Sequence, residues 1–226
     1  MPMKVSDHIV KRLQEWGVER IYGYAGDGIN GILAALDRAG NRPEFIQSAH
    51  EELSSLMACA HAKFTGQVGV CLATQGPGAI HLLNGLYDAR SDHQPVVAIV
   101  GQQSTTAMGG EYQQELDLIS LYKDVAGAYV QMATSPAAVR HMIDRALRIA
   151  LAERTVTCVI IPHDLQDEDA VEQPPKSTGR CTPGSAGRRR ASCQPTPTSP
   201  TPPRCSTAAR RSPCWSAPGR CGRPTR

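Results

Sequence analysis

Strand-like and helix-like segments alternate along residues 6–161, and this alternation limits the possible fold more than any other feature of the sequence. Two runs, 95–100 (PVVAIV) and 156–161 (VTCVII), are almost wholly apolar, as strands buried on both faces of a sheet are. The predicted strands span 20–24, 44–47, 67–73, 95–100, 128–131 and 156–161, and the predicted helices span 6–17, 28–40, 51–64, 78–90 and 136–153. This order predicts a doubly wound α/β fold, with a mostly parallel six-stranded sheet and helices on both faces.

The composition of the chain changes sharply near residue 173. Residues 1–173 hold all 21 acidic residues and 13 Lys and Arg, a net charge of −8, whereas residues 174–226 hold 11 Lys and Arg and no acid. The second segment also contains 11 of the 17 prolines and no Val, Ile, Leu, Met, Phe or Tyr. Such a segment buries too little apolar surface to offset the entropy of ordering it. We therefore expect one domain over 1–173 and a disordered basic Pro/Arg-rich tail over 174–226.

The composition of the tail is also that of a GC-rich gene translated in the wrong frame. When the frame is moved back by one nucleotide across 212–222, the codons permit an apolar-Leu-Val-Gly-Ala-Gly-Ala-apolar segment. Our hypothesis is a frameshift near residue 177. The rival interpretation, binding of nucleic acid or anionic lipid, has the arginines at 188–190 in its favour but only one aromatic residue, Trp215, for base stacking.

Unusual residues gather where the predicted strands end, which in a parallel sheet is the edge that binds ligands. The first such loop contains a G-x-G-x-x-G at Gly26, Gly28 and Gly31, and Glu51 follows about 20 residues later. This pattern is compatible with a Rossmann-type NAD or FAD site, with Glu51 on the ribose. Two details disfavour that alternative: Glu51 falls at a helix start rather than at a strand tip, and a second glycine turn, TQGPG at 74–78, has no role in it.

Four stretches, in order, resemble one known family. They are YGYAGDG (22–28), AHEELSSLMACAHAKFTG (49–66), GVCLATQGPGAIHLLNGLYDARSDHQPVVAIVGQ (69–102) and GGEYQQELD (109–117). The family is the thiamine-diphosphate enzymes of the pyruvate oxidase, quinone-linked pyruvate dehydrogenase and acetolactate synthase group. The resemblance covers residues 4–173 and only their N-terminal, pyrimidine-binding domain. It implies a 2-oxo-acid decarboxylating enzyme, with a non-enzymatic fragment as a further alternative.

The resemblance makes Glu51 the catalytic acid. A partly desolvated carboxyl group there would hydrogen-bond N1′ of the thiamine pyrimidine, so that the 4′-imino group removes the proton from the thiazolium C2. Without the resemblance, Glu51 would be interpreted as an ordinary first-turn acid stabilised by the helix dipole. The cofactor-binding residues that the resemblance implies are Tyr24, Ala25, Gly26, Glu51, Pro77, Gly78, His81 and Gln114, the last of which faces the active site across subunits. Leu56 and Met57 are expected in the core.

The resemblance also sets expectations for cofactors and partners. The expected cofactor is thiamine diphosphate, and Mg2+ and FAD would bind only through domains that the chain lacks. Gly26-Asp27-Gly28 matches the start of the family's magnesium motif, but the Asn-Asn pair of that motif is absent; we assign Asp27 to a turn and predict no metal ligand. We expect a truncated chain that is inactive alone, a 2-oxo acid such as pyruvate as substrate, homo-oligomeric full-length relatives, a cytoplasmic location, and neither a nucleic-acid partner nor a membrane span.

Overall fold

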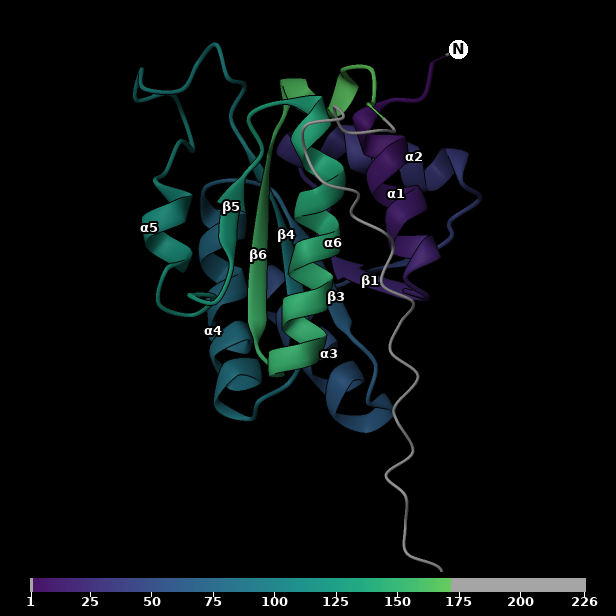
Figure 1. The fold of residues 1–226 in the computed structure, drawn as a ribbon. Helices are drawn as coiled ribbons and strands as arrows, with labels where there is room; N and C mark the ends of the chain where they lie inside the picture. The colour runs from purple at the N-terminus through teal and green to yellow at the C-terminus, as the bar shows by residue number, and fades with distance from the viewer. Residues whose placement is uncertain (1, 172–226) are drawn as a thin grey trace, which may run out of the picture. The chain divides into compact units, whose positions relative to one another are not determined.

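The computed structural model describes residues 2–171, which form one six-stranded sheet flanked by helices (Figure 1). All strand pairs are parallel, and the strand order is β2-β1-β3-β4-β6-β5. The strands are β1 (Arg20–Gly23), β2 (Glu44–Gln47), β3 (Gly69–Ala73), β4 (Val96–Gln102), β5 (Val130–Met132) and β6 (Val156–Pro162). The predicted α/β fold class is therefore confirmed, and the sheet is wholly rather than mostly parallel.

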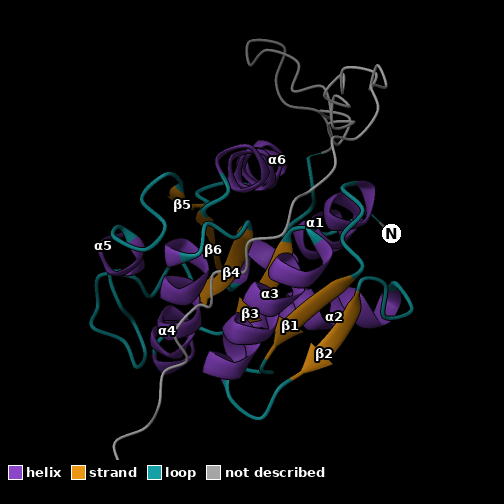
Figure 2. Ribbon diagram, turned by 90° about the horizontal axis from the view of Figure 1, so that it is seen from below, coloured by secondary structure: helices purple, strands orange, loops and turns teal. Residues whose placement is uncertain are grey.

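The helices connect the strands by crossovers whose direction decides which face each helix covers. They are α1 (Val5–Glu15), α2 (Asn30–Arg38), α3 (Glu51–Thr65), α4 (Pro77–Ser91), α5 (Leu118–Tyr122) and α6 (Pro136–Glu153), with 3₁₀ turns η1 (Asp27–Ile29) and η2 (Asp164–Asp167). The crossovers from β1 to β2 and from β5 to β6 run toward the edge of the sheet that β2 forms. The crossovers from β2 to β3, from β3 to β4 and from β4 to β5 run toward the opposite edge. Right-handed crossovers then require helices on both faces, and Figure 2 shows α6 and α1 on one side of the sheet and α4 on the other.

Two apolar cores, one on each face, hold these layers together. The central strands supply both cores because successive side chains point to opposite faces. In β3, Val70 and Leu72 pack in the core of α1, α2 and α6, while Cys71 and Ala73 pack in the core of α3, α4 and α5. All seven residues of β4 and of β6 are buried, which explains why these segments are apolar without alternation.

Local signals fix several helix ends where the sequence predicts them. Pro77 and Pro136 occupy the first turns of α4 and α6, where a missing N–H is tolerated. Helix α3 ends at Gly66, whose φ of 71° is the left-handed conformation that glycine adopts readily. The prediction misses the short helix α5, which lies in the irregular stretch 102–124, and it places β5 about two residues too early.

The structure also corrects one detail of the predicted core. Leu56 is 37% exposed, while Met57 is partly buried and packs against the core of α3, α4 and α5. The three cysteines of the described part, Cys59, Cys71 and Cys158, are buried free thiols. None of the helices in residues 2–171 combines the length and the apolar character needed to cross a membrane. The predicted disordered tail, the frameshift and the domain boundary at 173 lie outside the described residues.

Candidate active site

The candidate site lies where the sheet changes its winding direction. Strands β1 and β3 are neighbours, but the chain leaves β1 toward α2 on one face and leaves β3 toward α4 on the other. The loops after the two strands therefore diverge at their carboxyl ends, which is the position where open parallel sheets bind ligands. The loop after β2 reaches the same edge and leads into α3, so that three of the predicted functional segments meet there.

Glu51 is a buried carboxylic acid at the first residue of α3. Its side chain is only 11% exposed, and its Oε2 atom lies 3.0 Å from Nδ1 of His81, whose side chain is 41% exposed. The other carboxylate oxygen, Oε1, lies beside the backbone of Gly78, because a Cβ atom there would be 3.3 Å from it. Glu51, Gly78 and His81 thus come together from two helices, and His81 is the more exposed partner of the acid.

His50, which the sequence analysis did not include among the site residues, adds a second imidazole to this group. It is the N-cap of α3, with its Nδ1 accepting a hydrogen bond of 3.3 Å from the Glu52 amide. The rings of His50 and His81 lie 4.3 Å apart between centroids, with their planes inclined by 32°. Within residues 2–171, His50, Glu51 and His81 are the one cluster of three or more His, Cys, Asp or Glu residues with the spacing of metal ligands.

The three glycines of the G-x-G-x-x-G make room for side chains of the same chain. A Cβ atom at Gly26 would lie 2.8 Å from Thr74, at Gly28 1.4 Å from Oε1 of Gln75, and at Gly31 2.7 Å from Gln166. The two loops are also joined by a 3.0 Å hydrogen bond from the Gly28 amide to the Thr74 hydroxyl. Internal packing therefore accounts for this glycine pattern, and the dinucleotide-binding alternative loses the observation on which it depended.

Gln114 belongs to the same edge of the sheet. Gly76 has φ +64°, and a Cβ atom there would meet Cβ of Gln114 at 2.7 Å. Gln114 thus packs over the turn between β3 and α4 of its own chain. It also lines a cavity of about 290 Å³ with Asp27, Gly28, Gln75, Gln103, Tyr112, Gln113 and His163. Glu51 does not line this cavity.

The remaining predicted residues border the site. Tyr24 is 38% exposed at the end of β1, Ala25 is exposed and Gly26 is half-buried. Pro77 is exposed at the start of α4. Asp27 begins the 3₁₀ turn η1, in keeping with its predicted turn role.

Sequence reasoning did not identify the residues that hold the loops in place. Gln166 is fully buried in η2, where its Nε2 donates to the Gly28 carbonyl at 2.7 Å and its Oε1 accepts from the Ile32 amide at 3.2 Å. Thr74 and Gln75 connect the loops as described above. Thr74 and Gln75 belong to the TQGPG turn at 74–78, which the sequence analysis quotes. Nothing in the sequence around Gln166 indicates that its side chain reaches residues 28–32.

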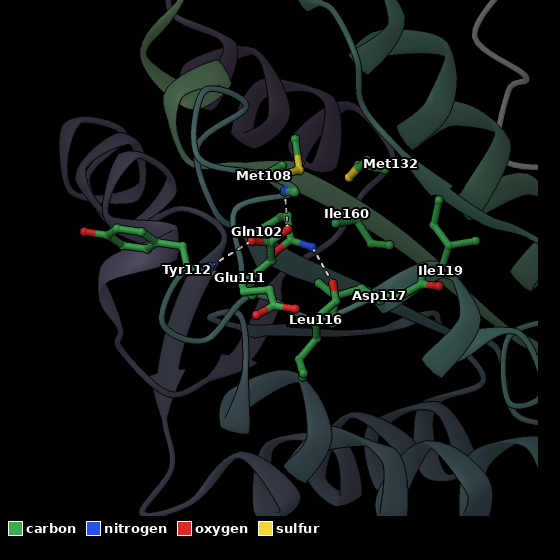
Figure 3. A pocket seen from close by; sticks show the side chains of 12 residues that line it. Gln102, Met108, Glu111, Tyr112, Leu116, Asp117, Ile119, Met132 and Ile160 are labelled. Carbon is green, nitrogen blue, oxygen red and sulfur yellow. Dashed lines mark hydrogen bonds between the residues drawn. The ribbon is translucent and has the colours of Figure 1, made fainter.

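A larger cavity lies at the carboxyl ends of β4, β5 and β6 (Figure 3). Glu51 is not among the residues that line it. Its volume is about 420 Å³, and its walls include Met108, Leu116, Ile119, Met132 and Ile160. Gln102, 4% exposed, donates from Nε2 to the Leu116 carbonyl at 2.9 Å and closes one side of it. The cavity contains none of the residues predicted to function.

Comparisons with known proteins identify the family of the chain. Residues 3–121 match the family described as "Thiamine pyrophosphate enzyme, N-terminal TPP binding domain". The chain is 46% identical over 157 residues to a pyruvate oxidase of Lactiplantibacillus plantarum, covering 70% of this chain and 26% of that protein. It is 41% identical over 162 residues to a putative thiamine pyrophosphate-containing protein, YdaP, of Bacillus subtilis, covering 72% and 28%.

A third relative carries a different printed activity. The large subunit of acetolactate synthase isozyme 2 of Escherichia coli is 40% identical over 119 residues, which is 53% of this chain and 21% of that protein. The chain spans about a quarter of the length of these curated relatives.

Proposed function

Because the chain belongs to the thiamine pyrophosphate enzyme family and contains its N-terminal TPP-binding domain, we propose that Glu51 is the acid that activates the cofactor. The observation that carries this proposal is a carboxyl group only 11% exposed, beside the backbone of Gly78, at the edge where open parallel sheets bind ligands. A carboxylic acid can exchange a proton with a ring nitrogen, so this donor fits an aminopyrimidine.

The residues around Glu51 divide the work of holding and orienting the cofactor. When bound, thiamine diphosphate supplies a nucleophilic thiazolium carbon that attacks a 2-oxo acid and accepts the electrons left by departing carbon dioxide. Glu51 holds the proton that is shared with the pyrimidine nitrogen. His81 contacts Oε2 and so restricts the rotation of the carboxyl group, while Gly78 leaves the space beside Oε1 open.

We propose a 2-oxo acid such as pyruvate as the substrate, on the basis of the relative named pyruvate oxidase. Another relative is named acetolactate synthase, which is a different activity. The role that we propose for Glu51 applies to either activity, because it concerns activation of the cofactor. Binding of Mg2+ and FAD, the cytoplasmic location and the inability of the chain on its own to decarboxylate a 2-oxo acid stay predictions. Activation of the cofactor at C2 precedes decarboxylation, and it is the step that we assign to Glu51.

Hydrogen exchange at the cofactor tests the role of Glu51. In the presence of Mg2+, the chain should accelerate exchange of the C2 proton of thiamine diphosphate for deuterium, followed by proton NMR. Glu51→Gln, which cannot give up a proton, should reduce this acceleration about 100-fold or more. The control is Glu52→Gln, because Glu52 is the next residue of α3 but contacts Asn84 instead.

Two results would contradict the proposal. One is a wild-type chain that does not accelerate the exchange at all. The other is an equal loss in the Glu51 and Glu52 variants, since a general effect of removing one negative charge would then be sufficient. Binding of NAD or FAD without binding of thiamine diphosphate would support the oxidoreductase alternative instead.

We also propose that the chain self-associates through α3 and α4. These two helices expose Leu53, Leu56, Ile80 and Tyr87, each between 37% and 46% accessible, although large apolar side chains are usually buried. In analytical ultracentrifugation we expect an oligomer for the wild type and a monomer for Leu56→Glu/Ile80→Glu. Leu151→Glu, on α6 and 36% exposed, is the control. An unchanged mass in the double variant would disprove this contact.

A further inference from the structure

The two imidazoles beside Glu51 have an arrangement that hydrogen bonding to the acid does not require. Only His81 contacts the carboxylate, whereas His50 caps α3 and lies against the ring of His81. One nitrogen of each ring and one carboxylate oxygen lie within 4.8 Å of one another. These atoms therefore surround a common point at the mouth of the site.

Two imidazoles and a carboxylate are a donor set for particular metal ions. Zn2+, Co2+ and Ni2+ bind imidazole nitrogen well, while Mg2+ prefers oxygen ligands alone. Tetrahedral coordination at ordinary zinc bond lengths needs ligand atoms about 3.4 Å apart. The three atoms lie within 4.8 Å of one another, so each pair must approach by about 1.4 Å at most. The two histidines are the partners free to move, because His50 is exposed and His81 is 41% exposed.

We propose that His50, Glu51 and His81 bind one borderline divalent metal ion, such as Zn2+, with a water molecule in the fourth position. The ion replaces the contact between His81 and Glu51 by bonds from both to the metal. Coordination through Nε2 of His50 requires the ring proton on Nδ1 and so gives up the bond from the Glu52 amide, which at 3.3 Å is already long.

This site has a consequence for the cofactor, which rests on the proposed function. Glu51 cannot coordinate a metal ion and share a proton with the pyrimidine nitrogen through the same lone pairs. Zinc and thiamine diphosphate therefore compete for the site, and the metal acts as an inhibitor. This proposal departs from the sequence-based prediction of no metal ligand in the chain, because the sequence alone does not show that His50, Glu51 and His81 lie together.

Calorimetric titration of the full chain with zinc chloride tests the metal site. Five of the eight cysteines lie at positions 181–221, and thiolates bind zinc, so accessible thiols are first blocked with iodoacetamide. The cysteines of the described part are at most 1% exposed, and burial raises the pKa of Cys59 and of Cys71 to about 12. They remain protonated and do not contribute.

We expect one zinc ion per chain, with affinity reduced at least tenfold by either His50→Asn or His81→Asn. The matched control is His141→Asn, which removes an exposed histidine of α6 and should leave the affinity unchanged. Visible absorption of bound Co2+ provides a second measurement and should disappear in the double variant His50→Asn/His81→Asn. Equal zinc affinity of the wild type and this double variant would overturn the site.

A competition experiment separates this inference from the proposed function. With Mg2+ in excess, zinc should slow the C2 exchange of thiamine diphosphate on the wild type and leave any exchange on the double variant unchanged. Zinc binding without accelerated exchange keeps the metal site and rejects the proposed function. Accelerated exchange without zinc binding does the reverse, and zinc binding that does not slow the exchange rejects the competition alone.

Discussion

Two regions at the same edge of the sheet differ in what they contain. Around β1, β2 and β3, buried and polar groups converge: Glu51 meets His81, and the loops are joined through Thr74 and Gln166. Around β4, β5 and β6, the cavity is larger, about 420 Å³. Its carboxylates, Glu111, Glu115 and Asp117, are exposed or half-buried, unlike Glu51. The region with the buried acid is therefore not the region with the larger cavity.

The difference shows what each measure of a site detects. Cavity volume reflects how loosely the segment over 108–119 covers the sheet. A catalytic acid instead needs a tight environment that limits its rotation and its access to water, and this leaves little empty volume in a single chain. The site that we propose therefore lies at the buried acid, where the sheet changes its winding direction, and not at the cavity of about 420 Å³.

Alanine at two glycines measures how tightly the two regions are packed. Gly76 and Gly109 both have positive φ, but a Cβ atom at Gly76 meets Cα and Cβ of Gln114, whereas at Gly109 nothing lies within 4 Å. Both substitutions incur backbone strain of about 1–3 kcal/mol. Gly76→Ala should lower the free energy of unfolding by a further 1–3 kcal/mol or so, because backbone must move. Urea denaturation measures both losses, and equal losses would refute the difference in packing.

The buried polar side chain of the second region, Gln102, should give a smaller effect, and only on stability. Gln102 donates to the Leu116 carbonyl and accepts from the Gln103 amide, both at 2.9 Å. Gln102→Leu leaves these groups without partners and should cost about 1–3 kcal/mol. The exposed Gln131→Leu should change stability by less than about 0.5 kcal/mol. If Gln102→Leu slowed C2 exchange as much as Glu51→Gln while the protein stayed folded, the division between the two regions would be wrong.

Much of the fold was accessible from the sequence because its strands are buried on both faces. Segments such as 95–100 and 156–161 are almost wholly apolar, and this composition is typical of strands buried on both faces of a sheet. Glycine or proline marks several helix ends. The short helix α5 was missed because five residues give too little periodicity for a pattern to be recognised. Strand order and handedness follow from the parallel pairing and the right-handed crossovers.

The candidate site could be predicted only from the resemblance to the thiamine-diphosphate enzymes. A glutamate at a helix start is ordinary in sequence, and its burial depends on α4, whose His81 lies 30 residues away. The glycine pattern misleads in isolation, because its space is taken by Thr74, Gln75 and Gln166. Contacts between segments so distant in the chain leave no periodic signal, and for this reason the supporting residue Gln166 could not be predicted.

The smallest effect that we predict concerns η2, which supports both regions. Gln166 holds the loops of the first region. Asp164 accepts hydrogen bonds of 3.0 Å from the Thr105 amide, near the start of the segment that covers the second region.

Burial raises the pKa of Asp164, but the hydrogen bonds from the Thr105 side chain and amide outweigh it and lower the pKa overall. A carboxyl group with a lowered pKa stabilises the fold above its ordinary pKa, and this stabilisation disappears as pH falls through the lowered value. The difference in unfolding free energy between wild type and Asp164→Asn should therefore be constant from pH 7 to about pH 5 and shrink below about pH 4. Thr105→Val should reduce the same pH-dependent difference, and a difference that stays constant down to pH 3 would show that this tether contributes nothing.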